Sequence, residues 1–443
     1  MKRAPNLDNV STKLERIAEL ARRRPPVAIN TLAHHIDVEF LHAAYQRTRK
    51  DGASGVDGTT AAVYEVNLEK NLQSLLDRFK SGTYFAPPVR RVHIPKDDGD
   101  TRPIGIPTFE DKVLQRAVAM VLTAVYEQGF LDCSYGFRPG RSAHDALEVL
   151  WKELTAMGGG WVLEVDIRRF FDSVDHQHLR AILDQRVRDG VIRRMIDKWL
   201  KAGVQEDGTL SYPDAGTPQG GVISPLLANV YLHEVLDVWF EHEVKPRLRG
   251  KAVIVRYADD FVIAFAQETD ARRVMDVLPK RFGRYGLTLH PEKTRLVEFR
   301  RPTGNGGGPG TFDLLGFTHF WERSEKRKHW WVVKRKTATA RFGRALKRVS
   351  EWCRRNLHRP VPEQHKALAR KLVGHYGYFG IIGNSRSLGR FKFEVEKIWR
   401  TWLRRRSSAS RPRWRWQRFN ELLRRTPLPP PRVVHRLAAK LSV

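Results

Sequence analysis

The chain has 443 residues, of which 79 are Lys or Arg and 49 are Asp or Glu, so its formal net charge is +30 at pH 7. Hydrophobic residues make up 41% of the sequence, which excludes a disordered basic tail and predicts folded domains with a core. The sequence contains no run of 18 apolar residues, and its first residues lack the apolar core of a signal peptide. We therefore expect a cytoplasmic protein that binds a polyanion, with nucleic acid favoured over a membrane surface.

The predicted elements begin with a basic, helical N-terminal extension over residues 1–50. Two apolar runs on either side of the polar turn at 96–100 predict a β-hairpin with basic residues at its tip. Helices are expected over 112–126 and 142–157, on either side of the turn-forming sequence SYGFRPGRS. Cys133 and Cys353 cannot form a disulfide framework or a zinc site of paired CxxC motifs, and we expect both to be buried.

Apolar runs in the middle of the sequence predict strands. The run WVLEVDI at 161–167 reads as a buried strand, and the segment at 251–266 reads as two strands hinged on Ala258, Asp259 and Asp260. A helix over 270–285 and a strand and turn over 286–299 follow. The glycine-rich segment 302–310 predicts a hairpin loop, and the basic residues from about Glu322 onward show helical periodicity.

Three acidic residues stand out in this basic chain, Asp166 at one strand end and Asp259 and Asp260 between two apolar strands. Carboxylates brought together at strand ends resist joint ionisation unless a cation neutralises them. Mg²⁺ prefers oxygen ligands and binds one or two carboxylates together with substrate phosphates. The pattern predicts a divalent-metal site, where two ions about 4 Å apart would assist phosphoryl transfer. Taken alone, the string YADD is also compatible with a solvated turn.

Cations and aromatic residues alternate in the C-terminal region, as in HWWVVKRK and RPRWRWQRF. This pattern is typical of segments whose cations contact phosphates and whose aromatic rings stack on unpaired bases. A helical bundle with a tryptophan core and solvated arginines is the alternative, and both can hold. We expect helix-spaced tryptophans in the core, whereas RWRW at 413–416 is expected to be too charged to bury and to contact nucleic acid.

Over about residues 50–320 the sequence contains eight motifs, GVDG, RPIGIP, SYGFRPGRS, DIRRFFD, GTPQGGVISPLLANVYL, YADD, HPEKT and LLGF. They occur in the order found in group II intron-encoded reverse transcriptases, and the sequence resembles that family. The part containing GHYGYFGIIGNS is similar to the family's thumb, or maturase, region. The resemblance implies an α+β fold, a right-hand polymerase with fingers, a ferredoxin-like palm and a mainly helical thumb. The boundaries that we expect are an N-terminal extension at 1–50, fingers at 51–160, a palm with fingers insertions at 161–320, a thumb at 321–400 and a basic C-terminal region at 401–443.

The resemblance also implies roles for individual residues. Asp166 and Asp259 match the metal-bridging carboxylates, Asp260 matches the third acidic position, and the carbonyl of Ile167 is an expected further ligand. Lys293 matches a lysine proposed as a general acid near the phosphates, although a surface lysine is the alternative.

Further matches concern the nucleotide and the nucleic acid. Lys96 and Arg102 match cations that grip the triphosphate, and Phe171 matches the gate against a ribose 2′-hydroxyl; solvated cations and a core aromatic are the alternatives. Gln219, Gly220 and Gly221 match the family's loop that supports the incoming nucleotide and the template. Glycine suits this position because it permits close approach of the backbone. Nucleic-acid contacts are expected from residues of the basic C-terminal region, namely Arg404, Arg405, Arg406, Arg413, Trp414 and Arg415.

The resemblance implies an RNA-directed DNA polymerase that extends a DNA primer on an RNA template with dNTPs and two Mg²⁺ ions, for which Mn²⁺ can substitute. A second implied activity is that of a maturase acting on its own intron RNA. The alternatives are a free-standing polymerase in repair, phage defence or CRISPR adaptation, and a non-enzymatic RNA-binding splicing factor. Phe171 disfavours RNA-directed RNA synthesis. The sequence lacks the His/Asn motifs and paired cysteines of the family's endonuclease, so it resembles the endonuclease-lacking members.

Overall fold

The structure is a computed structural model of mixed helix and sheet content, an α+β fold. It describes residues 7–23, 27–95, 101–212, 215–217, 220–302, 310–325, 329–407 and 413–435. The chain forms two compact units. The first comprises Met1–Ala146, Val165–Ile263 and Thr269–Arg295, and the second comprises Leu147–Glu164, Ala264–Glu268 and Leu296–Val443.

The helices alternate with strands in the first two thirds of the chain and dominate the last third. In chain order they are α1 (Leu7–Arg23), η1 (Ala33–His35), α2 (Val38–Arg47), α3 (Ala61–Glu65), α4 (Leu68–Ser81), α5 (Phe109–Tyr126), α6 (Ala143–Met157), α7 (Phe170–Ser173), α8 (His176–Asp184), α9 (Gly190–Leu200), α10 (Ser224–Leu232), the π-helical η2 (His233–Val244), η3 (Lys245–Arg247), α11 (Glu268–Gly283), α12 (Thr339–Arg355), α13 (Val361–Phe379), α14 (Ser385–Arg404) and α16 (Trp416–Arg425). Within the described residues, none of these helices is long and apolar enough to cross a membrane.

The strands form three sheets, whose orders are β2-β1-β4-β5, β6-β7-β3-β8 and β11-β10-β9. Their bounds are β1 (Val89–Pro95), β2 (Thr101–Ile106), β3 (Trp161–Val165), β4 (Val204–Glu206), β5 (Thr209–Ser211), β6 (Ala252–Tyr257), β7 (Asp260–Phe265), β8 (Arg295–Glu298), β9 (Phe312–Leu314), β10 (Phe317–Arg323) and β11 (Trp331–Thr337).

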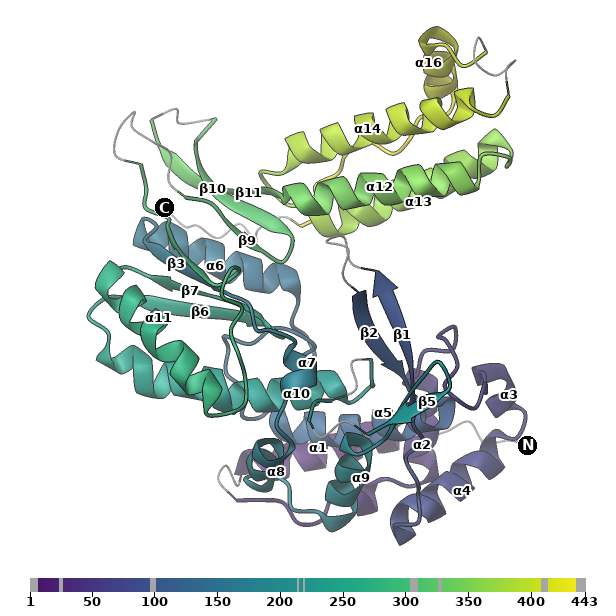
Figure 1. Cartoon of the computed structure of the whole chain (residues 1–443), viewed down its shortest axis with the longest axis vertical. Coiled ribbons are helices and arrows are strands. Elements are labelled where there is room, and N and C mark those ends of the chain that lie inside the picture. Colours follow the sequence, from purple (N-terminus) through teal and green to yellow (C-terminus); the bar gives the residue numbers. More distant parts are fainter. Residues whose placement is uncertain are drawn as a thin grey trace. The chain divides into compact units, whose positions relative to one another are not determined.

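In the first unit, two predicted hairpins are confirmed. Strands β1 and β2 pair antiparallel with Arg90 opposite Ile106, and their connecting turn at 96–100 lies outside the described residues. Strands β6 and β7 flank the predicted acidic turn, and they are buried along nearly their whole length because a helix covers this sheet. Helix α11 provides that cover (Figure 1), with Phe282 stacked on Phe261 at a centroid distance of 6.1 Å.

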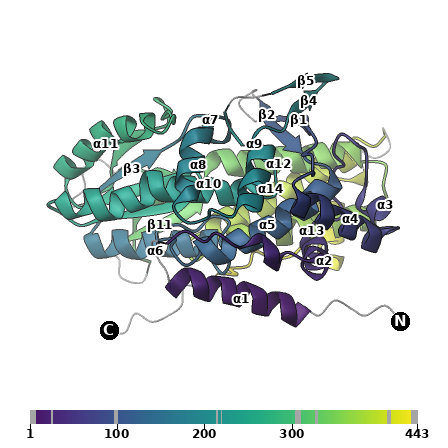
Figure 2. The same ribbon diagram turned by 90° about the horizontal axis from the view of Figure 1, so that it is seen from below.

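The predicted N-terminal helix is confirmed as α1, which packs against α5 through its buried face. Ile17 and Ala21 lie on that face. Figure 2 shows α1 at the edge of the first unit. The predicted helices over 112–126, 142–157 and 270–285 are found as α5, α6 and α11.

In the second unit, one part of the predicted helical region is wrong. Residues Trp331–Thr337 form strand β11, which pairs antiparallel with β10. Val333, Arg335 and Thr337 are buried in alternation with more exposed neighbours, a period of two that suits a strand. The predicted hairpin loop at 302–310 lies largely outside the described residues.

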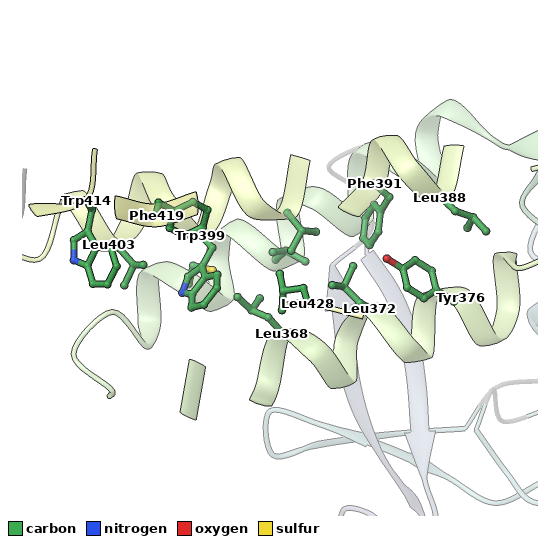
Figure 3. Packing of buried hydrophobic residues seen from close by; sticks show 13 residues of the cluster. Leu368, Leu372, Tyr376, Leu388, Phe391, Trp399, Leu403, Trp414, Phe419 and Leu428 are labelled. Atoms are coloured by element: carbon green, nitrogen blue, oxygen red, sulfur yellow. The ribbon is translucent and has the colours of Figure 1, made fainter. Parts of the chain in front are cut away.

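The helices after β11 are packed on one apolar cluster, whose side chains interdigitate between α12, α13, α14 and α16 (Figure 3). Trp399 is fully buried at its centre and donates its indole hydrogen to Gln364 Oε1 at 2.9 Å. Cys353 is buried here as expected, whereas Cys133, in the first unit, is only half-buried. The cluster extends to Phe419 and Leu428, so it continues past residue 400, where α14 also continues to Arg404.

Candidate active site

The two acidic motifs both lie in the first unit, where Asp166 is close enough to Asp259 for its charge to act on it. Asp166 directly follows β3, and Asp259 lies in the turn between β6 and β7. Burial raises the pKa of the Asp259 carboxyl above its ordinary value, and the nearby charge of Asp166 raises it further. Asp260 is exposed at the start of β7. Asp166 and Asp259 are therefore close enough for their like charges to repel each other.

The backbone after β3 is held by the segment that contains HPEKT. The amide of His290 donates to the carbonyl of Asp166, and the amide of Arg168 donates to the carbonyl of Thr288, both at 2.8 Å. Ile167 and Leu289 face each other as an antiparallel β-bridge between these two hydrogen bonds. In such a pair neither the N–H nor the C=O of Ile167 bonds to the opposite segment. That the Ile167 carbonyl binds a metal stays a prediction.

Two cations of the first unit lie near this carboxylate pair. Lys293 Nζ is 3.5 Å from Asp166 Oδ2, and its side chain is 61% exposed. Arg102, on β2, is close enough for its charge to act against the rise in the pKa of Asp259. Lys96, the other expected phosphate contact, lies outside the described residues.

The segment that begins the TPQGG motif rests on α7. The amide of Thr217 donates to the carbonyl of Phe171 at 2.7 Å, and a Cβ at Gly216 would lie 2.9 Å from Asp172 Cα. Phe171 itself is half-buried, whereas its neighbour Phe170 is 2% exposed and occupies the core. The structure thus assigns the core position of the FF pair to Phe170 and leaves Phe171 partly exposed.

The other end of this segment rests on β2. Gly220 has a φ of +115°, and a Cβ there would lie 2.6 Å from Ile104 Cγ2 and 2.7 Å from the Gly105 carbonyl oxygen. Only glycine permits this approach. Gly221 is buried, and Gln219 lies outside the described residues.

A buried polar network, which the sequence reasoning missed, fixes the residues that follow this loop. Gln115 Oε1 accepts a hydrogen bond from the amide of Val222 at 2.7 Å, and Gln115 Nε2 donates to Asp111 Oδ2 at 2.8 Å. Asp111 also accepts from Tyr84 and Trp199. The signal available in the sequence was a pair of polar residues, four apart, on the helical face that also carries the apolar residues Leu114 and Val118.

Because burial raises the pKa of Asp111 to about 6, from an ordinary value of 3.8, this carboxyl binds its proton more tightly in the folded state. The resulting stabilisation is fully present below the unfolded-state pKa and is lost as the pH rises through about 6. We expect Asp111→Asn to reduce the fall in unfolding free energy between pH 4 and pH 7 by about 2 kcal/mol. Urea denaturation at successive pH values measures this. Asp132→Asn, at an exposed carboxylate, is the control, and an unchanged pH profile of Asp111→Asn would contradict the prediction.

The basic C-terminal residues divide into exposed and structural members. Arg404, Arg405, Arg413 and Arg415 are exposed. Arg406 is half-buried and donates to the backbone carbonyls of Leu357 and Arg359, so it holds the connection between α12 and α13.

The expectation that RWRW at 413–416 is too charged to bury is wrong for Trp414. Its side chain is 9% exposed and belongs to the apolar cluster (Figure 3), so the ring cannot stack on a base. Burying an indole removes so much apolar surface from water that it outweighs the charge of the flanking arginines, which remain solvated. Trp416 is 41% exposed, with the Arg400 guanidinium 3.8 Å from its ring centroid.

Comparison with known proteins agrees with this site. The family described as "Reverse transcriptase (RNA-dependent DNA polymerase)" matches residues 94–319, just over half of the chain. Protein YkfC of Escherichia coli is 36% identical over 327 residues, covering 65% of this chain and 84% of YkfC. Group II intron-encoded protein LtrA of Lactococcus lactis is 37% identical over 243 residues, covering 53% of this chain and 40% of LtrA.

A plant relative shares the same region. Nuclear intron maturase 2, mitochondrial, of Arabidopsis thaliana is 30% identical over 235 residues, which cover 44% of this chain and 30% of that protein. This chain therefore spans less than half the length of LtrA and of the plant maturase, and most of the length of YkfC. The chain belongs to the reverse transcriptase (RNA-dependent DNA polymerase) family, in its group II intron-encoded branch.

Proposed function

We propose that this reverse transcriptase extends the 3′-hydroxyl of a DNA primer on an RNA template by phosphoryl transfer at Asp166 and Asp259, with two Mg²⁺ ions. The observation that carries the proposal is the pairing of these two carboxylates beside Arg102 within the region that the family matches. In this reading the β1–β2 hairpin belongs to the fingers, the sheet with β3, β6 and β7 to the palm, and α12–α14 to the thumb.

The residues present fit a divalent cation. Asp166, Asp259 and the Ile167 carbonyl offer only oxygen donors, which Mg²⁺ and Mn²⁺ prefer. Magnesium in such sites commonly takes one or two carboxylates and completes its shell with substrate phosphates. Bound here, the ions would stabilise the attacking and leaving oxygens.

The protein's own side chains supply the remaining steps of this proposal. Arg102, together with Lys96, would bind the negative charge of the triphosphate and orient it toward the primer end. Lys293, held at Asp166, carries a proton at Nζ that it can donate to the leaving pyrophosphate. Phe171 would exclude a 2′-hydroxyl, and the loop with Gln219, Gly220 and Gly221 would support the base pair.

The proposed function is tested by extension of a labelled DNA primer on an RNA template. We expect full-length product only when dNTPs and Mg²⁺ or Mn²⁺ are both present. Omission of the metal with a chelator, and replacement of dNTPs by rNTPs, are the controls. A folded protein that extends the primer with neither metal would contradict the proposal.

We also propose a maturase role, for which the exposed arginines of the C-terminal unit and the intron-encoded relatives give the reason. Assisting an intron to fold requires only preferential binding of the folded RNA, and no nucleotide is consumed. Polymerisation and splicing are therefore expected to separate by mutation.

A palm variant with Asp259→Asn and Asp260→Asn is expected to lose extension but to promote splicing of its cognate intron at low Mg²⁺. A variant with Glu at Arg404, Arg405, Arg413 and Arg415 is expected to lose tight RNA binding and splicing, because RNA binding weakens with every cation that no longer neutralises a phosphate. It should keep short extension on a pre-annealed duplex.

The matched control for the arginine variant reverses four exposed cations elsewhere, on α4 and around α11, with the same change in net charge: Lys70, Arg273, Lys280 and Arg284. Splicing, extension and thermal melting are measured side by side. If the folded palm variant loses splicing, or the arginine variant splices normally, the maturase role of this surface is contradicted and a free-standing polymerase becomes the better reading.

A further inference from the structure

A fully buried arginine lies beneath the turn that carries Asp259. Arg256, on β6, is 0% exposed, and its five guanidinium hydrogens are all used. Nε and Nη2 donate to the two carboxylate oxygens of Asp237 at 2.7 and 2.5 Å. Nη2 also donates to Ser134 Oγ at 2.7 Å. Nη1 donates to Asn229 Oδ1 at 2.9 Å and to the carbonyl oxygen of Ala258 at 3.0 Å.

The bond to Ala258 reaches a strained residue. Ala258 has a φ of +57°, in the left-handed region that L-residues other than Asn and Asp rarely adopt, and it directly precedes Asp259. Such a conformation persists only where the surrounding structure holds it. A carbonyl fixed by a buried guanidinium provides that restraint on one side of the turn.

The loop of the SYGF sequence restrains the other side. A Cβ at Gly136 would lie 2.4 Å from the Ala258 amide nitrogen, so the two backbones are in close contact. Asn229, which accepts from Arg256, also donates to the Gly136 carbonyl at 2.7 Å. The amide of Tyr135 donates to the Arg256 carbonyl at 2.9 Å. One network thus holds both the turn and the loop that supports it.

The charge of Arg256 is compensated by Asp237, with both side chains fully buried. A salt bridge alone would occupy two of the five donors, and an apolar pair of similar volume would serve stability as well. The other three hydrogens bond Ser134, Asn229 and Ala258, which come from separate segments that meet at the turn. This geometry is specific to a planar guanidinium.

We propose that Arg256 is a positioning residue for the reaction: by holding the Ala258 carbonyl it keeps the strained turn in place and Asp259 directed toward Asp166 and the metal. The proposal rests on the proposed polymerase function. It assigns to Arg256 an effect on metal binding and turnover that exceeds its contribution to folding.

The test compares Arg256→Lys with Arg281→Lys. Lysine keeps the charge opposite Asp237, but a single ammonium cannot bond Asp237 and Ala258 in the same plane. Arg281, on α11, is half-buried and donates to the carbonyls of Glu234 and Val235 in η2, the helix that also carries Asp237, so it is a control for a structural arginine away from the turn. For each protein we measure kcat, primer–template Kd, Mn²⁺ binding by electron paramagnetic resonance, and the melting temperature.

We expect Arg256→Lys to lower kcat at least tenfold and to raise the Mn²⁺ dissociation constant several-fold, with primer–template Kd unchanged within twofold. Arg281→Lys should leave kcat and Mn²⁺ binding as in the wild type, whatever its melting temperature. Wild-type Mn²⁺ binding and kcat in folded Arg256→Lys would overturn the proposal, as would equal effects of the two variants.

If Arg256→Lys does not fold, the Asn229→Ala variant tests the proposal in its place. It removes the second acceptor of Nη1, the nitrogen that bonds Ala258, and we expect weaker Mn²⁺ binding and a kcat at least threefold lower. Unchanged values would overturn the proposal. An inactive wild-type protein would instead contradict the proposed polymerase function, so the two failures are distinguishable.

Discussion

Replacement of Asp259 by Asn is expected to reduce primer extension by several orders of magnitude while leaving the fold and RNA binding intact. A neutral amide would hold the proposed metal ions far more weakly than a carboxylate, and the charge stabilisation that they would give the transition state would be lost. Single-turnover extension with a saturating primer–template duplex measures the loss directly, because binding then no longer limits the rate.

The same variant should not be less stable than the wild type. Burial and the charge of Asp166 raise the pKa of Asp259, so folding disfavours the ionised carboxylate, and an amide removes that cost. Loss of activity together with an equal or higher melting temperature is the signature of a group kept for function.

The control is Asp276→Asn, which removes an exposed carboxylate from α11 in the same unit. It should retain full activity. Near wild-type extension by Asp259→Asn in Mg²⁺ would show that the acidic turn is not the site of phosphoryl transfer.

Phe171→Ala is expected to raise incorporation of ribonucleotides relative to deoxyribonucleotides on the order of tenfold or more. The reason is steric: Phe171 is half-buried, its backbone contacts the start of the TPQGG loop, and we expect removal of its ring to make room for a 2′-hydroxyl. Phe171→Val, with an intermediate side chain, should give an intermediate ratio. Competing rNTP and dNTP in single-nucleotide extension measures the ratio independently of enzyme concentration.

Phe170→Leu is the matched control, since Phe170 is the adjacent core aromatic and makes an edge contact with Phe171 at 5.3 Å. It should lower the melting temperature and leave the sugar ratio unchanged. A stable Phe171→Ala protein with the wild-type ratio would assign Phe171 to packing and reopen RNA-directed RNA synthesis as an alternative.

The sequence by itself determined the local elements that carry the acidic residues. An apolar run that ends in Asp166, and two apolar runs around Ala258, Asp259 and Asp260, predict strands and a turn from a few adjacent residues, and the structure has β3, β6 and β7 there. Turn chemistry and hydrophobic periodicity act over short distances along the chain, so they can be read without knowledge of the fold.

Only the tertiary structure decided which of several similar residues are buried. Trp414 enters the apolar cluster while Trp416 remains exposed, and Phe170 rather than Phe171 occupies the core. Each pair has the same local composition, so the choice depends on what lies opposite, which residues distant in sequence provide.

The tertiary structure also decided which polar residues support the site. Arg256 meets Ser134, Asn229 and Asp237, and Gln115 meets the backbone of Val222, across separations of 19 to 122 residues. In the sequence, Arg256 is only an arginine that precedes a tyrosine, and Gln115 is only a glutamine within a predicted helix. A buried polar group must find its hydrogen-bond partners wherever the fold places them, and that pairing has no signature along the chain.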